Sequence, residues 1–89
     1  MKDSEKRFLM IVYTKVNASN GVYAKHVLDI EGNAKQNLYY LEKWTKKDWY
    51  DYGVSINTGW LTGLGKQKAW ELLPWWNEAQ QKEAKEQEP

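Results

Sequence analysis

The sequence predicts a small α+β domain, an antiparallel sheet packed by helices, and two stretches carry this prediction. Residues 7–16 (RFLMIVYTKV) are rich in β-branched and aromatic side chains and continuously apolar at their centre, which is typical of a buried strand. In residues 34–52, apolar side chains recur at three- and four-residue steps, which indicates a helix. Because the chain has 89 residues, a single domain is expected.

The predicted N-terminal strand is followed by a turn signal. Asn20 and Gly21 both tolerate the positive φ angles of a tight hairpin turn. The next segment, 22–30, fits a strand with alternating apolar residues or a helix with one apolar stripe. The turn favours the strand, so we expect an N-terminal hairpin.

The central helix is expected over residues 34–52. Asn33 precedes it as an N-cap residue, and Gly53 follows it where helices commonly end. Its predicted buried stripe consists of Ala34, Leu38, Leu41, Thr45, Trp49 and Tyr52. Four aromatic side chains fall outside this stripe: Tyr39, Tyr40, Trp44 and Tyr50. The first three suit the core and the surface equally.

The remaining predicted elements are short. Residues 54–56 and 60–62 read as strands joined by a turn. Residues 66–73 form a second predicted helix, which is longer if Pro74 opens a continuation instead of ending it. Together with the hairpin, these elements complete the sheet and the helices that cover it.

The C-terminal residues 77–89 are polar and lack an apolar stripe, which predicts a helix end or disorder. Residues 1–76 then form the α+β domain. The tail carries four Glu and two Lys, a net charge of −2, whereas residues 34–68 carry six Lys against three acidic side chains, a net charge of +3. This basic bias is smaller than expected of a dedicated duplex-DNA binder.

The sequence contains no motif for enzymatic chemistry. Without cysteine it has no thiol nucleophile and no Cys-based zinc site, and a lone His26 offers little for a metal. Asp48 and Asp51 lie three residues apart on the predicted helix, where carboxylates usually form a solvated face and not a catalytic pair. The glycine-rich segment 59–67 lacks the spacing and the hydroxyl of a phosphate-binding loop. We expect no catalytic residue, no cofactor and no metal, and a protein that is not an enzyme.

The apolar run at residues 8–13 bears on the cellular location of the protein. It is too short to cross a membrane or to form the apolar part of a secretion signal. We therefore expect a cytoplasmic protein without a membrane partner.

Aromatic side chains alternate with lysines in the middle of the chain, where residues 39–53 hold six aromatics and three lysines. Aromatic side chains with a charged rim are typical of protein-binding hot spots. Trp75 and Trp76 cannot share the centre of one narrow stripe, because successive helical residues point about 100° apart. One of them then suits the core and the other the surface. The predicted partner-binding residues are Tyr40, Trp44, Trp60, Trp75 and Trp76.

Two functions agree with this pattern. The leading hypothesis is a non-enzymatic protein that binds and modulates a partner, first of all another protein, through an aromatic surface with a lysine rim; a homodimer interface is an alternative use of that surface. The composition resembles that of small accessory proteins of bacteriophages and mobile elements, being short, cysteine-free and rich in Lys, Asn, Trp and Tyr. The second hypothesis is a binder of single-stranded DNA or RNA, with aromatic rings stacked on bases and lysines on phosphates. Its predicted residues are Lys43, Trp44, Lys46, Lys47, Lys66 and Lys68.

Overall fold

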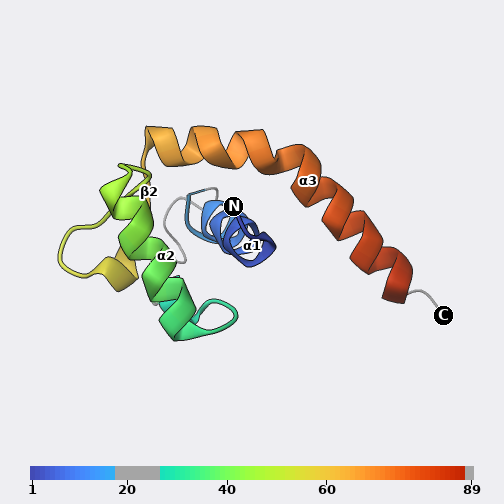
Figure 1. The fold of residues 1–89 in the computed structure, drawn as a ribbon, viewed down its shortest axis with the longest axis horizontal. Helices are drawn as coiled ribbons and strands as arrows, with labels where there is room; N and C mark the ends of the chain where they lie inside the picture. The colour runs from blue at the N-terminus through green and yellow to red at the C-terminus, as the bar shows by residue number, and fades with distance from the viewer. Residues whose placement is uncertain (18–26, 88–89) are drawn as a thin grey trace.

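A computed structural model describes residues 1–17 and 27–87 of the chain. These residues form three α-helices and one two-stranded antiparallel sheet, which confirms the α+β class. Helix α1 crosses the middle of the fold, with α2 on one side and α3 arching over it (Figure 1). The elements are α1 (Asp3–Val12), α2 (Ala34–Lys46), β1 (Tyr50–Asp51), β2 (Trp60–Leu61) and α3 (Gly63–Gln87).

The N-terminal segment is a helix, and the strand predicted over residues 7–16 is wrong. Helix α1 continues into a π-helical turn, Tyr13–Asn17, so the predicted N-terminal hairpin lacks its first strand. A continuous apolar run suits a helix enclosed on most sides as well as a strand, and here tertiary packing overrides β-propensity. The enclosed side chains of α1 are Glu5, Phe8, Leu9, Met10, Ile11 and Val12.

The second half of the predicted hairpin lies mostly outside the described residues. This applies to the turn at residues 20–21 and to most of the segment 22–30. Its last part, Val27–Asp29, is a short 3-10 helix and not a strand. The buried amide of Asn37 on α2 holds this turn by donating to the carbonyl oxygen of Leu28 at 2.8 Å.

Helix α2 starts at the predicted residue. The side-chain oxygen of Asn33 accepts two backbone N–H groups of the first turn, at 2.9 and 3.2 Å, as an N-cap does. The buried side differs from the predicted stripe, since Ala34 is exposed. The helix is rotated because two aromatic rings of α2 pack against Phe8 of α1 and stack with each other. The buried residues of α2 are Asn37, Tyr40, Leu41 and Trp44.

Helix α2 ends at Lys46 and not at residue 52. Asp48 has a positive φ of 61°, and its N–H donates to the carbonyl oxygen of Thr45 at 3.2 Å. The N–H of Trp49 donates to the carbonyl oxygen of Trp44 at 2.9 Å. These two bonds form a Schellman motif, which ends the helix although aspartate stands where glycine is usual.

The sheet is a single hairpin in which Tyr50 lies opposite Leu61. The predicted return strand is confirmed at β2, but the strand predicted at 54–56 is wrong, because the pairing occurs earlier, at β1. The hydroxyl of Tyr50 donates to the carbonyl oxygen of Ile56 at 2.6 Å and accepts the N–H of Gly59 at 2.9 Å. Burial raises the pKa of Tyr50 to about 12, so the hydroxyl keeps its proton and holds the loop at neutral pH.

Helix α3 begins earlier than predicted, at Gly63, and includes the second part of the glycine-rich segment 59–67. The hydroxyl of Thr62 caps it by accepting the N–H of Gly65 at 3.2 Å, and it also donates to the carbonyl oxygen of Asp48. Pro74 lies inside the helix, which continues to Gln87. Proline removes one helical hydrogen bond and bends a helix, and α3 changes direction partway along its length (Figure 1).

Candidate functional site

An ion pair between a buried carboxylate and a half-buried ammonium joins the start of α1 to α2. Glu5 is 2% exposed. Its Oε1 accepts a hydrogen bond from the ammonium of Lys43 at 2.9 Å, and its Oε2 accepts one from the indole N–H of Trp44 at 3.0 Å. Both oxygens of the carboxylate have a donor, as burial of a charge requires. The hydrogen bond to Glu5 raises the pKa of Lys43, which therefore stays charged.

The same contacts act on the pKa of Glu5. Burial alone raises the pKa of this carboxyl, but the hydrogen bonds from Trp44 and Lys43, with the charge of Lys43, outweigh burial and leave the pKa lowered. A carboxyl whose pKa is lower in the folded state stabilises the fold above its unfolded pKa. That contribution is lost as the pH falls through the folded pKa.

Glu5→Gln is expected to lower the free energy of unfolding at neutral pH by about 1–3 kcal/mol, because the buried indole N–H of Trp44 and the half-buried ammonium of Lys43 lose a charged acceptor. The deficit should shrink as the pH falls below about 4.3, the pKa of glutamate in an unfolded chain, and it should vanish below the lowered pKa of folded Glu5. Urea denaturation between about pH 3 and pH 7 measures this, with Glu42→Gln on the exposed side of α2 as the control. A deficit that stays constant over this range would contradict the stabilising role of the ion pair.

An exposed tyrosine stands among lysines on the outer side of α2. Tyr39 is 62% exposed. It borders a hollow of about 510 Å³ shared with Lys2 and Lys43, and a second hollow of about 280 Å³ shared with Lys43, Lys46 and Lys47. We call these five residues the Tyr39 face.

The charge of the Tyr39 face is positive. Besides its four lysines, the two hollows are lined by two acidic side chains, Glu5 and Glu42. Glu5 is already neutralised by Lys43, which leaves Lys2, Lys46 and Lys47 against Glu42. The Tyr39 face thus combines an open aromatic ring with a local excess of ammonium groups.

At Trp49, a lysine of α3 approaches a lysine of the Tyr39 face. The ammonium of Lys47 lies 4.7 Å from the centroid of the Trp49 ring, and that of Lys68, on α3, lies 5.6 Å from it. Both distances are within the range of cation–π attraction. Trp49 therefore brings a lysine from the end of α2 and one from the start of α3 to the same ring.

The predicted partner-binding aromatics are not brought together. Tyr40 is 4% exposed and Trp44 is 0% exposed, so both belong to the core, and their placement on a contact surface is corrected. They are buried because their rings pack against Phe8 between α1 and α2, Trp44 stacked on it and Tyr40 tilted. Trp60, on β2, is 44% exposed and remains a surface residue.

Trp75 and Trp76 lie where α3 passes α1, and both are half-buried. Trp76 packs against the core. Trp75 lines a hollow of about 300 Å³ beside Asp3, and the ammonium of Lys6 lies 5.3 Å from its ring centroid. The two rings lie against the N-terminal helix and not on an open face.

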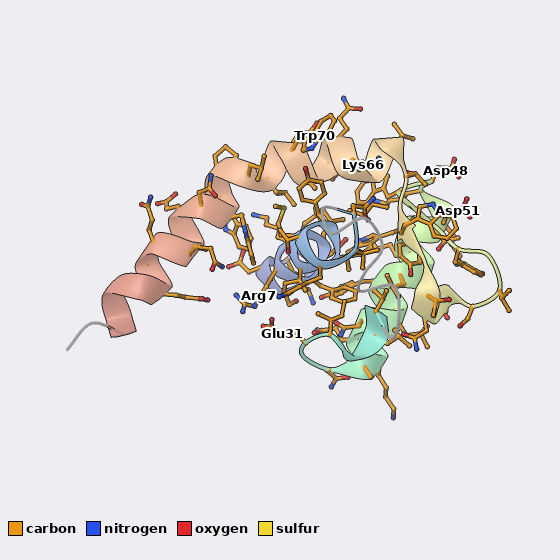
Figure 2. The ribbon with its side chains drawn as sticks, turned by 180° about the vertical axis from the view of Figure 1, so that it is seen from behind. Arg7, Glu31, Asp48, Asp51, Lys66 and Trp70 are labelled. Atoms are coloured by element: carbon orange, nitrogen blue, oxygen red, sulfur yellow. The ribbon has the colours of Figure 1, made fainter. Side chains whose placement is uncertain are left out.

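Arg7 links α1 to the segment before α2 and to α3. Its guanidinium pairs with Glu31, before α2, at 2.6 Å and with Glu83, on α3, at 3.0 Å. It also lies 6.0 Å from the centroid of the Trp76 ring. Figure 2 shows Arg7 of α1 beside Glu31. These contacts hold the second part of α3 against α1.

The lysines predicted for nucleic acid are mostly brought together. Lys43, Lys46 and Lys47 share one hollow, and Lys68 reaches the same region through Trp49. Lys66, near the start of α3, differs because it lines neither of the two hollows. We therefore leave Lys66 out of the candidate site.

Two members of the Tyr39 face, Tyr39 itself and Lys2, are not among the site residues that the sequence predicts. The signal for Tyr39 is its position next to Tyr40, because one of two successive helical residues faces outward when the other is buried. No local signal marks Lys2, whose place depends on the packing of α1 against α2.

Comparisons with protein-family models, with curated proteins and with solved structures found no significant match to this chain. Among the residues that the structure describes, no group of three or more His, Cys, Asp or Glu side chains is arranged to hold a metal ion. In the same residues, no helix combines the length and the apolar character needed to cross a membrane.

Proposed function

We propose that this chain is a non-enzymatic binding protein that holds single-stranded nucleic acid on the Tyr39 face. One observation carries the proposal: an aromatic ring that is 62% exposed stands between two hollows, and four lysines line them. Single strands are usually held without reading their sequence by aromatic rings that stack on bases and by cationic side chains that contact the phosphates.

Each residue of the face has a role in this proposal. The ring of Tyr39 stacks on an unpaired base, a contact worth about 1–3 kcal/mol. Lys2, Lys46 and Lys47 contact phosphates on either side of it. Lys43 is fixed by Glu5 at the boundary of the two hollows, so it shapes the face more than it adds net charge. We assign no catalytic step to any residue.

Tyr39→Ala is expected to weaken binding of a labelled oligothymidylate by about tenfold, because the stacking contact is lost. Fluorescence anisotropy at low salt measures the affinity. Trp70→Ala is the matched control, since Trp70 is another aromatic that is 54% exposed but lies on α3. Equal losses in both variants, or no binding at low salt, would contradict the proposal.

The number of lysines that contact phosphate predicts how strongly salt weakens binding of the nucleic acid. Contact of three lysines with a single strand gives a slope of log K against log salt of about −2, at about 0.7 per phosphate. Raising the salt from about 50 to about 200 mM should then weaken binding by roughly an order of magnitude. A flat salt response would mean that phosphates are not contacted.

A protein partner or a second copy of the chain, which is the leading hypothesis from the sequence, becomes the second candidate. The residues that favour this candidate are Trp60 and Trp70, whose side chains are 44% and 54% exposed. Their side chains come from β2 and α3, outside the Tyr39 face. Concentration-dependent self-association that Trp70→Ala abolishes, in a protein that does not bind nucleic acid, would favour this candidate.

A further inference from the structure

We propose that the bound strand continues from the Tyr39 face past the end of α2 and is held there by Lys68 of α3. This inference rests on the proposed function and adds to it the direction of the strand, along the axis of α2, and a second anchoring point on another helix. It assigns a specific role to Trp49, which is to hold two ammonium groups together.

The junction that places Lys68 is tightly built. The carbonyl oxygen of Trp49 accepts the N–H of Thr62 at 2.9 Å, directly before α3. Gly65, in the first turn of α3, lies so close to the same carbonyl that a Cβ atom there would overlap it. The start of α3 is thus locked to the end of α2, and Lys47 and Lys68 approach one ring from the two helices.

The length of α2 sets how much nucleic acid the Tyr39 face covers. Gln36 lines the first hollow and Lys47 the second, and these positions are about 17 Å apart along a helix that rises about 1.5 Å per residue. A stacked strand advances about 3.4 Å per nucleotide, so about five nucleotides fit this distance. A longer strand that follows α2 toward its C-terminus next meets Lys68.

On α3 itself, the carboxylate of Glu71 competes with a phosphate for contact with Lys68. Its ammonium lies 3.4 Å from the carboxylate of Glu71, whose side chain is 59% exposed. An exposed pair of this kind is weak, so a phosphate can replace the carboxylate as the partner of Lys68. Removing the charge of Glu71 should therefore strengthen binding of a strand that reaches this point.

The experiment compares oligothymidylates of about four and about ten nucleotides. Glu71→Gln is expected to tighten binding of the longer probe by about two- to fivefold and to leave the shorter probe unchanged. Lys68→Ala is expected to weaken binding of the longer probe and to reduce its slope of log K against log salt by about 0.7. Binding of the shorter probe should not change. A gain of affinity in Glu71→Gln cannot result from a damaged fold.

Glu78→Gln is the matched control, because it removes the same charge two turns further along α3, about 10 Å away. If Glu78→Gln tightens binding as much as Glu71→Gln, the effect is one of net charge and the path over Lys68 is refuted. If both probes bind and both depend on Tyr39 but neither responds to Lys68 or Glu71, the path fails and the proposed function stands. If neither probe binds, both proposals fail.

Discussion

Replacing Trp44 by alanine is expected to lower the free energy of unfolding by about 3–5 kcal/mol, the largest loss we predict for a single side chain. Trp44 is 0% exposed. Its ring stacks with Phe8 at 5.4 Å and with Tyr40 at 6.2 Å between centroids. The variant also leaves Oε2 of the buried Glu5 without its donor. Packing and hydrogen bonding are thus lost together.

Urea denaturation followed by circular dichroism measures this loss. Trp70→Ala is the control for a tryptophan that is 54% exposed, and it should cost about 1 kcal/mol or less. Trp44→Phe keeps an aromatic ring but removes the indole N–H, so it should fall between the two and remain foldable. If Trp44→Ala cost no more than Trp70→Ala, the placement of Trp44 in the core would be wrong.

Gly65→Ala is the second substitution with a large expected effect, at least about 2 kcal/mol of destabilisation. A methyl group at this position would overlap the backbone carbonyl of Trp49 and would crowd the side chain of Leu61. The backbone cannot yield as a flexible side chain does, so α3 must move away from the hairpin. The variant should also lose the contact of Lys68 with the Trp49 ring.

Gly63→Ala is the matched control for this prediction. No heavy atom lies near the place a Cβ would take at Gly63, which is the first residue of α3. Alanine there should be neutral or stabilise the helix by up to about 1 kcal/mol. The two glycine variants should therefore differ in sign in thermal denaturation. A stabilised Gly65→Ala would show that α3 does not pack on Trp49.

The sequence predicts those elements whose signals are local. The N-cap at Asn33 and the return strand at β2 carry such signals, and both occur as expected. The strand over residues 7–16 fails because an apolar run looks alike in a strand and in an enclosed helix. The end of α2 was missed because Asp48 replaces the glycine of a helix-ending motif. The start of α3 was missed because two glycines disfavour a helix, although Gly65 is required by contact with Trp49.

The candidate site was predictable to a similar extent. Lysines 43, 46 and 47 gather as the sequence pattern predicts, because they lie close together on one helix. The aromatic partner was misassigned, since the rotation of α2 buries Tyr40 and Trp44 and exposes Tyr39 instead. That rotation depends on where α1 packs, and α1 had been predicted as a strand. The error in one element therefore carried over to the site.

The most direct test of the account is to map the contact surface by NMR, recording backbone amide shifts of the isotope-labelled protein as oligothymidylate is added. We predict that the perturbed amides cluster on α2 around Tyr39 and Lys46, extend to the start of α3, and return toward their free positions when salt is raised. Perturbations confined to β2 and to α3 around Trp70, or no perturbation at low salt, would contradict nucleic-acid binding on the Tyr39 face.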